Sequence, residues 1–347
     1  QHQICYTPEN YYGICVVFTE CQSLVEYYGQ NKDSQEAVQY LNQVQRNCSS
    51  KSESNDQVVC CAEAYNNHYL QKPHTGNGDV ILNGPECGLS SEFTSKKVVG
   101  GEPAKIGAWP WITLLGYGVS EISPFMCGGS LITKRHVITA AHCVKSDLKF
   151  VRLGEHDLGS STETTTIDIN VVRVKISHPK YNPRNGKNDI GILYLETAVS
   201  YTERIHPVCI PKDPPLRTQS FVDYELYVAG WGRTQEGGKS AEVLQQLPLP
   251  VWENEVCRDK YSSQRRLSSK DQFDEATICA GILTGGMDTC QGDSGGPLMY
   301  PQKEDDIIRF YLIGVVSYGI GCARADIPGV YTNVANFIDW IEQKIMS

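Results

Sequence analysis

The fourteen cysteines of this 347-residue chain constrain its fold more than any other feature of the sequence. An even number of cysteines at this density is typical of disulfide-bonded proteins from an oxidising compartment. Six of them fall within residues 1–61, where aliphatic side chains are too few to bury a stable core unaided. Three disulfides supply the deficit, at ~2–4 kcal/mol each in the loop-entropy account. We therefore expect a secreted, extracellular protein that begins with a small disulfide-rich module.

The cysteines of residues 1–61 could serve either disulfides or a zinc ion. The one close cluster is the adjacent pair Cys60-Cys61, and no histidine pair stands beside it at the spacing of zinc ligands. Disulfides are therefore favoured over zinc. Six cysteines allow fifteen pairings, and spacing alone does not choose among them. The six are Cys5, Cys15, Cys21, Cys48, Cys60 and Cys61.

Local patterning adds one helix and three short strands to this module. Apolar residues at three- and four-residue spacing predict a helix over residues 33–44. Its buried stripe is expected to consist of Ala37, Val38, Leu41 and Val44. Short β-prone runs predict strands at residues 11–12, 15–18 and 57–60. The first module is therefore expected to be a small α+β domain.

The rest of the chain divides into a linker and a large β-rich domain. Residues 62–97 are rich in Asn, Gly, Pro, Ser and His and show little periodicity, which indicates a linker. From residue 98 to residue 347, strand-like runs recur between turn clusters, which indicates an all-β barrel or sandwich. The clearest runs are residues 111–115, 137–140, 171–176, 190–195, 227–229 and 313–318. A closing helix is predicted from Val334, Phe337, Ile338, Ile341 and Ile345, with Asn333 as its N-cap.

Composition argues against two classes of partner. The net charge of −9 gives no support for nucleic-acid binding. No apolar run approaches the ~18 residues of a membrane span, so we expect no such span. Because the chain begins at Gln1 without a basic and apolar leader, we expect that any signal peptide has been removed.

One run near the C-terminus, residues 288–297, carries the most specific chemical signal. Its sequence is Asp-Thr-Cys-Gln-Gly-Asp-Ser-Gly-Gly-Pro, which is too rich in glycine for a helix or a central strand. The glycines allow backbone N–H groups to converge on one point, as a developing oxyanion requires. Ser294 in this run is therefore a candidate nucleophile. A tight surface turn is the alternative when the run is taken alone.

A serine hydroxyl needs a neighbouring base, because it is a poor nucleophile at neutral pH. His142 is predicted at a strand end, beside a cysteine that can anchor it. Asp189 leads into an apolar strand, where a carboxylate is costly to bury unless it accepts hydrogen bonds. Orienting an imidazole through its second nitrogen provides such a bond. The alternative for His142 is an ordinary core or surface histidine, one of eight in the chain.

The run around Ser294 and the chain order His142, Asp189, Ser294 resemble chymotrypsin-like serine proteases over residues 98–347. This resemblance implies an all-β domain of two barrels with a C-terminal helix. It also implies a hydrolase whose chemistry requires no cofactor. Backbone N–H groups of Gly292 and Ser294 are expected to form the oxyanion hole.

The same resemblance implies a specificity pocket for basic side chains. Asp288 is expected at its floor, because a carboxylate at the end of an open slot selects Arg or Lys. Gly319 and Gly329 are expected to keep the slot open. Ser317-Tyr318-Gly319 is the expected substrate-binding edge, with Ser317 also near Asp189. A solvated turn acid is the alternative role for Asp288.

Activation by cleavage is implied as well. Ser95-Lys96-Lys97 ends the polar linker, where an activating protease can reach an extended backbone. Val98-Val99-Gly100-Gly101 resembles the new N-terminus that chymotrypsin-like enzymes bury after cleavage. Asp293 is the acid expected to receive the freed amino group of Val98. We therefore expect a zymogen that is cut at Lys97–Val98, with residues 62–97 as linker and activation segment.

The cysteine order of residues 1–61, ending in an adjacent pair, resembles the clip domain of arthropod proteases. Some other small knotted module is the alternative. The clip resemblance implies the disulfides Cys5–Cys60, Cys15–Cys48 and Cys21–Cys61. The protease resemblance implies Cys127–Cys143, Cys257–Cys279 and Cys290–Cys322. Cys87 and Cys209 remain, and their pairing would tether the linker to the protease domain.

A weaker signal lies in the acidic loop that begins at Glu155 and Asp157 and reaches Glu163. Related proteases bind calcium in this loop through carboxylates and backbone carbonyls, so these three acids are candidate ligands of a structural Ca²⁺. The spacing to the second acid is imperfect, and a solvated acidic loop is the alternative.

The combined hypothesis is a secreted clip-domain, trypsin-like serine endopeptidase of an extracellular cascade. The resemblance points to innate immunity, clotting, melanisation or Toll signalling, and to insect venoms. It implies a protein substrate, an upstream activating protease and serpin-type inhibitors as partners. Two alternatives differ in class: a catalytically silent homologue that acts as a cascade cofactor, and a protein that works by clip-mediated binding. Because Ser294, His142 and Asp189 are all present, the silent homologue is disfavoured.

Overall fold

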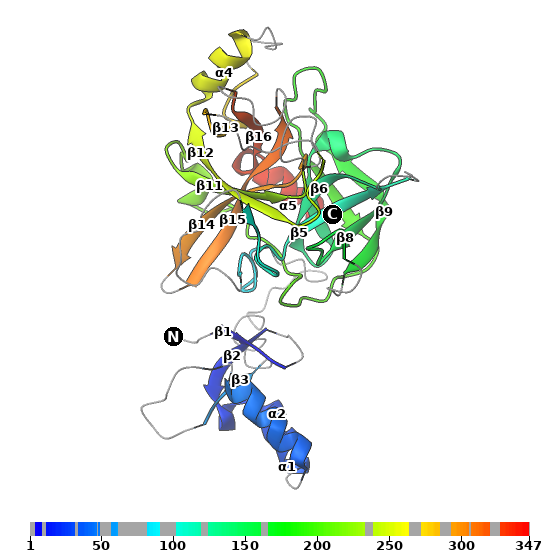
Figure 1. Cartoon of the computed structure of the whole chain (residues 1–347), viewed down its shortest axis with the longest axis vertical. Coiled ribbons are helices and arrows are strands. Elements are labelled where there is room, and N and C mark those ends of the chain that lie inside the picture. Colours follow the sequence, from blue (N-terminus) through cyan, green and yellow to red (C-terminus); the bar gives the residue numbers. More distant parts are fainter. Residues whose placement is uncertain are drawn as a thin grey trace. The chain divides into compact units, whose positions relative to one another are not determined.

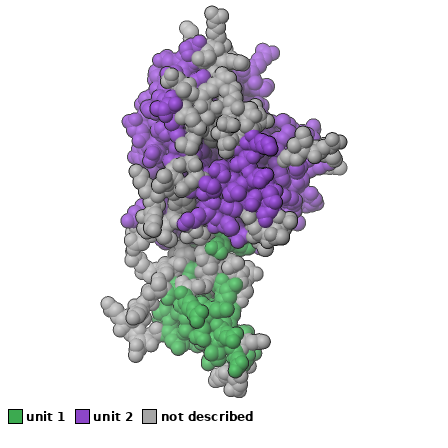
Figure 2. All heavy atoms as spheres, in the orientation of Figure 1, with its two compact units in different colours: residues 1–79, 84–86, 201–203 green, residues 80–83, 87–200, 204–347 purple. Residues whose placement is uncertain are grey.

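A computed structural model of the chain shows how these sequence patterns fold (Figure 1). It describes residues 4–8, 12–31, 34–46, 48, 57–61, 82–90, 102–118, 124–160, 166–232, 239–263, 272–284, 293–304, 307–319 and 327–346. The chain divides into two units, shown in different colours in Figure 2. The first comprises residues 1–79, 84–86 and 201–203, and the second residues 80–83, 87–200 and 204–347.

The first unit is a three-stranded antiparallel sheet with two helices. The strands β1 (Ile4–Tyr6), β2 (Tyr12–Val17) and β3 (Val58–Cys61) pair in that order. A short 3₁₀ turn, η1 (Phe18–Glu20), leads into the helices α1 (Gln22–Gln30) and α2 (Gln35–Arg46). The disulfides are Cys5–Cys60, Cys15–Cys48 and Cys21–Cys61, the three pairs that the clip resemblance implied. Cys21–Cys61 and Cys15–Cys48 fasten the two ends of the helical segment to the sheet, and Cys5–Cys60 joins β1 to β3.

Two details of this unit differ from the sequence prediction. The predicted stripe of α2 is too wide, because Ala37 and Val44 are buried while Val38 is 44% exposed. In a unit this small, α2 packs on one side only, so its contact with the core is limited to the narrow stripe at positions 37, 41 and 44. Helix α1 was not predicted, since its sequence contains glycine and lacks a regular aliphatic stripe. Phe18 belongs to the 3₁₀ turn rather than to a strand.

The second unit contains two β-barrels. The first barrel closes in the strand order β10-β7-β6-β5-β8-β9. Its strands are β5 (Ile112–Tyr117), β6 (Phe125–Thr133), β7 (His136–Thr139), β8 (Leu148–Leu153), β9 (Ile167–Ser177) and β10 (Gly191–Leu195). The 3₁₀ turn η2 (Ala141–Cys143) follows β7 after one residue, Ala140.

The second barrel has the order β11-β14-β15-β16-β13-β12 and closes through pairing of β12 with β11, while β4 (Glu102–Pro103) extends β12. Its strands are β11 (Glu225–Gly230), β12 (Gln245–Trp252), β13 (Thr277–Ala280), β14 (Pro297–Glu304), β15 (Ile307–Tyr318) and β16 (Gly329–Asn333). The turn η3 (Leu216–Thr218) precedes β11, and helix α4 (Asn254–Ser263) connects β12 to β13. The expected fold of two barrels is therefore confirmed.

The C-terminal helix is also confirmed, but its first turn is a 3₁₀ turn rather than an α-helical one. The chain forms a 3₁₀ turn, η4 (Val334–Phe337), before α5 (Ile338–Ile345). Asn333 caps this turn, because its Oδ1 accepts a hydrogen bond from the Ala335 amide at 3.3 Å. All five apolar residues of the predicted stripe are buried. Within the described part of the chain, each helix is too short or too polar to cross a membrane.

Candidate active site

His142 and Asp189 meet because of strand register in the first barrel. Strand β7 pairs antiparallel with β10, and Thr139 lies opposite Gly191. His142 comes three residues after the end of β7, and Asp189 two residues before the start of β10. Both therefore lie at the same edge of the barrel. The Cys127–Cys143 disulfide fastens the turn that carries His142 to β6.

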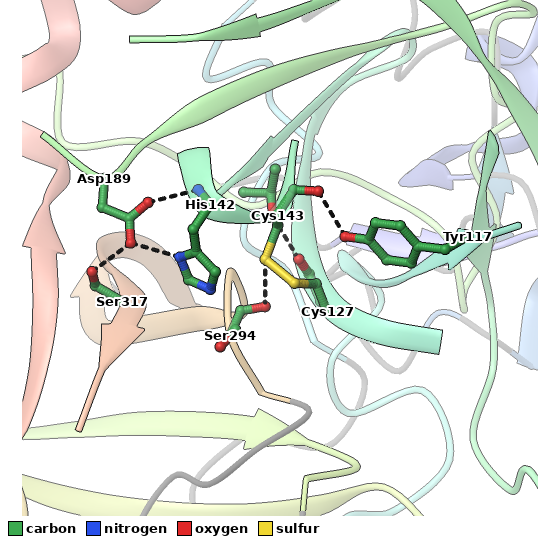
Figure 3. Close-up of a disulfide and its surroundings, with 9 residues drawn as sticks. Tyr117, Cys127, His142, Cys143, Asp189, Ser294 and Ser317 are labelled. Atoms are coloured by element: carbon green, nitrogen blue, oxygen red, sulfur yellow. Dashed lines mark hydrogen bonds and ion pairs between the residues drawn. A yellow bond between two sulfur atoms is a disulfide. The ribbon is translucent and has the colours of Figure 1, made fainter. Parts of the chain in front are cut away.

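Asp189 holds the histidine through two hydrogen bonds (Figure 3). Its Oδ1 accepts from the His142 backbone amide at 2.9 Å, and its Oδ2 lies 2.7 Å from His142 Nδ1. The Asp189 side chain is 3% exposed and that of His142 is 30% exposed. A buried carboxylate beside Nδ1 favours the tautomer that carries its proton there, which leaves Nε2 as a proton acceptor.

A third donor comes from the second barrel. Ser317, near the end of β15, donates from Oγ to Asp189 Oδ2 at 2.6 Å. The Thr332 hydroxyl on β16 donates to the Asp189 carbonyl oxygen at 2.8 Å. These bonds satisfy the buried acid, which would otherwise be costly. The nearness of Ser317 to Asp189 that the sequence predicted is confirmed.

Ser294 lies between the barrels, just before β14. Its carbonyl oxygen accepts from the Gly128 amide on β6 at 2.8 Å. The next residue, Gly295, has φ +81°, and a Cβ there would lie 2.2 Å from Thr139 Oγ1. Glycine is therefore required at this position. In Figure 3 the edge of the His142 ring that points away from Asp189 faces the Ser294 side chain.

The side chain of Asp293, the residue before Ser294, lies against the end of β11. Its Oδ1 accepts from the Gly232 amide at 2.8 Å. A Cβ on Gly230 or on Gly232 would come within 2.0 Å of the Asp293 carboxylate. The two glycines thus leave room for this acid between β11 and the Ser294 turn.

Tyr318, the last residue of β15, is held by residues that the sequence did not single out. Gln272 is buried, and its Nε2 donates to the Tyr318 hydroxyl at 2.7 Å. The ring lies against the backbone of Gly186, where a Cβ would come within 2.3 Å of Tyr318 Cε1. Burial, assisted by the charge of Asp189, raises the pKa of Tyr318 to about 12, against the hydrogen bond from Gln272. No local pattern predicts a contact between residues 46 positions apart.

Several predicted site residues lie outside the described part of the chain. They are Lys97, Val98, Glu163, Asp288, Cys290, Gly292 and Cys322. Gly319 follows β15, and Gly329 begins β16, where Val330 pairs with Tyr318. Cys127–Cys143, Cys257–Cys279 and Cys87–Cys209 form as expected. The proposed Cys290–Cys322 bond falls on undescribed residues.

The acidic loop fits calcium only in part. Glu155 is not a solvated acid, because its side chain is 6% exposed. Its Oε1 accepts from the His156 amide at 3.0 Å, and Arg152 Nη1 donates to its Oε2 at 3.4 Å. Asp157 Oδ1 accepts from the Gly159 amide at 2.9 Å. Glu155 is thus a buried carboxylate of the kind that calcium uses, but an arginine already lies beside it.

Comparison with known proteins places this geometry in a family. Residues 98–341 match the family described as Trypsin, and residues 5–61 match the regulatory CLIP domain of proteinases. The chain belongs to the clip-domain serine proteases of the trypsin family, and it is a serine endopeptidase.

Three relatives show the range of proteins that this chain is similar to. Venom serine protease Bi-VSP of Bombus ignitus is 38% identical over 97% of this chain and 91% of its own length. Proclotting enzyme of Tachypleus tridentatus is 42% identical over 75% of this chain and 69% of its own length. Phenoloxidase-activating enzyme 1 of Spodoptera litura is 34% identical over 99% of this chain and 94% of its own length.

Proposed function

We propose that this endopeptidase is made as a zymogen, is activated by cleavage at Lys97–Val98, and cuts proteins after Arg or Lys in an extracellular cascade. The observation that carries the catalytic part is the buried Asp189 carboxylate, 2.7 Å from His142 Nδ1, with Ser294 on the other side of the ring. These three residues have the chain order and arrangement of a serine-protease triad.

The chemistry follows from that arrangement. His142 Nε2 accepts the Ser294 proton as Oγ attacks the scissile carbonyl. Asp189 stabilises the imidazolium that forms, and backbone N–H groups of Gly292 and Ser294 stabilise the oxyanion. His142 then gives the proton to the leaving amine, and the acyl-enzyme forms. Water attacks the acyl carbon with His142 again as base, which releases the product acid and restores Ser294.

Specificity and activation belong to the same proposal. Asp288 at the pocket floor, with Ser317, Gly319 and Gly329 along the slot, would select basic side chains. Cleavage after Lys97 would free the α-amino group of Val98 to pair with Asp293. The position of Asp293 against the Gly232 amide supports this role, because it keeps the carboxylate on the β11 side of the Ser294 turn.

The cascade role rests on the names of relatives, which include a proclotting enzyme and a phenoloxidase-activating enzyme. Protein substrates, an activating protease and serpin-type inhibitors are the proposed partners of a secreted enzyme. Calcium, if bound, would be held by Glu155, Asp157 and Glu163 and would order the loop, with no part in peptide cleavage.

Hydrolysis of peptide amides tests the function. After cleavage at Lys97–Val98, confirmed by mass spectrometry, the protein should cleave substrates ending in Arg or Lys and ignore matched substrates ending in Phe. Ser294→Ala should lower kcat by several orders of magnitude. Unchanged turnover in that variant would show that Ser294 is not the nucleophile. No turnover by the cut wild type would support the silent-homologue alternative. Deletion of residues 1–61 tests the binding alternative, because small-peptide hydrolysis should survive it.

A further inference from the structure

The described end of the linker is built into the catalytic unit by more than the Cys87–Cys209 disulfide. Asn83 and residues 87–90, here called the strap, lie within the same unit as both barrels. Cys87 and Leu89 are buried, with 2% and 6% exposure. The strap therefore belongs to the core of that unit.

Gly88 joins two parts of the barrel unit through its backbone. Its amide donates to the Pro207 carbonyl at 2.8 Å, and its carbonyl accepts from the Phe310 amide at 2.8 Å. Gly88 has φ +68°, and a Cβ there would lie 2.3 Å from the Phe310 carbonyl oxygen. Only glycine allows this approach.

Asn83 adds a pair of hydrogen bonds to one residue. Its Nδ2 donates to the Ile210 carbonyl at 2.8 Å, and its Oδ1 accepts from the Ile210 amide at 2.8 Å. The amide side chain thus satisfies both backbone groups of Ile210, as a neighbouring strand would.

Two side-chain bonds complete the attachment. Arg309 Nη1 donates to the Cys87 carbonyl at 2.8 Å. The Ser90 hydroxyl donates to the Ala108 carbonyl at 2.8 Å. Without the strap, the amides of Ile210 and Phe310 and the Pro207 carbonyl would each lose the partner given above, at a cost in stability.

We propose that the surface formed by residues 207–210 and 309–310 is a binding site for the strap, and that it retains the severed clip-bearing chain even when Cys87–Cys209 is open. The inference rests on the proposed activation cut, since only a cut chain needs to be retained. The Cys87–Cys209 disulfide then adds a covalent link between two chains that backbone hydrogen bonds of the strap already hold together.

The strap pairs with β15, the strand that also carries Ser317 to Asp189. Phe310, which pairs with Gly88, and Ser317, which donates to Asp189, belong to the same strand. Loss of the strap should therefore lower the melting temperature of the catalytic unit as well as release the clip chain.

The test uses the full chain with the disulfide removed by Cys87→Ser and Cys209→Ser, in a Ser294→Ala background that prevents self-digestion. Substitution of residues 93–96 by aspartates creates an enteropeptidase site that ends at Lys97, so the cut does not depend on the natural activator. After the cut, gel filtration should show both chains eluting together. Added Asn83→Ala or Gly88→Ala should speed their separation about tenfold or more, because hydrogen bonds or close approach are lost.

Asn170→Ala is the matched control, because Asn170 donates to exposed Glu196 and does not touch the strap. It should leave retention unchanged. Immediate separation of the chains with Asn83 and Gly88 intact would overturn the proposal. If the double-serine variant does not fold, the cut protein with native cysteines is treated with mild reductant, and mass spectrometry identifies the fraction in which only Cys87–Cys209 is open. Co-elution is then expected, and separation refutes the strap. A failure of the proposed activation would be distinguishable, because the chain with its natural sequence would then remain uncut at Lys97–Val98.

Discussion

Ser317 Oγ donates a 2.6 Å hydrogen bond to Asp189 Oδ2, the same oxygen that lies 2.7 Å from His142 Nδ1. One carboxylate oxygen of Asp189 therefore joins the His142 ring of the first barrel to the Ser317 hydroxyl of the second. The bond fixes the orientation of Asp189 and links the two barrels at the point where Ser294 enters the site.

Ser317→Ala should lower kcat while leaving KM nearly unchanged. The variant removes a donor to a charged acceptor, and such a bond contributes about 1.5–3 kcal/mol, or roughly 10–100-fold in rate. Ser317→Thr keeps the hydroxyl and should retain more activity than Ser317→Ala. Steady-state kinetics on an Arg substrate measures both effects. Equal kcat in all three proteins would show that Asp189 is oriented without Ser317.

Gln272→Leu should raise KM for peptide substrates more than it changes kcat. Gln272 fixes the Tyr318 hydroxyl at 2.7 Å, and Tyr318 lies in the expected substrate-binding edge, away from the reacting bond. Loss of this bond should loosen the ring against Gly186. Gln245→Leu is the control, since that amide donates to Val243 instead. A fall in kcat at constant KM would contradict a positioning role in substrate binding.

Calcium should raise the melting temperature if the acidic loop binds it through buried Glu155. Glu155→Gln should abolish the rise, because a neutral amide is a weaker ligand than a carboxylate. Asp168→Asn is the control. It breaks the exposed ion pair in which Arg152 Nε lies 2.7 Å from Asp168 Oδ1, and calcium should still raise the melting temperature of this variant. Differential scanning fluorimetry with calcium and with a chelator measures this shift. Equal melting temperatures in both conditions would indicate that Arg152 alone neutralises the loop.

The stability of the fold should fall between about pH 6.5 and pH 4 because of His136. Burial, with the positive charge of Arg135, lowers the pKa of His136 to about 4 from 6.5. Across that window the unfolded chain takes up a proton that the folded chain does not, so the free energy of unfolding decreases as pH falls. His136→Gln should make this decrease smaller, measured as the difference between the free energies of unfolding from denaturant titrations at pH 7 and pH 5. The same difference in the variant and the wild type would show that other groups set the pH dependence.

The residues proposed as the triad could be picked out from the sequence because each lies in a short local pattern. Ser294 lies within a glycine-rich run, while His142 and Asp189 flank apolar strands. The contacts of Gln272 with Tyr318 and of Asn83 with Ile210 join residues 46 and 127 positions apart. Such contacts depend on barrel closure, which no local window contains.

Helix α2 shows the same limit on a smaller scale. Periodicity located the helix, but it could not tell how wide a stripe the small core would cover. Val38 lies at the edge of that stripe and is exposed, whereas Ala37 next to it is buried. The width is set by the partner sheet and the disulfides, and neither is visible in the helix sequence.

Asp293→Asn should be cut normally at Lys97–Val98 yet remain nearly inactive. The proposed cut lies in the linker, whereas the Asp293 carboxylate lies against Gly230 and Gly232, where we propose that it receives the new amino group of Val98. An amide cannot pair with that buried cation, and stranding a buried charge costs roughly 3–5 kcal/mol. The corresponding loss in kcat/KM is roughly 10²- to 5 × 10³-fold. Asp223→Asn, an exposed change of the same kind, should leave activity intact. Mass spectrometry establishes the cut, and hydrolysis of an Arg substrate measures activity. A fully active, correctly cut Asp293→Asn enzyme would show that the amino group of Val98 is not held by this acid.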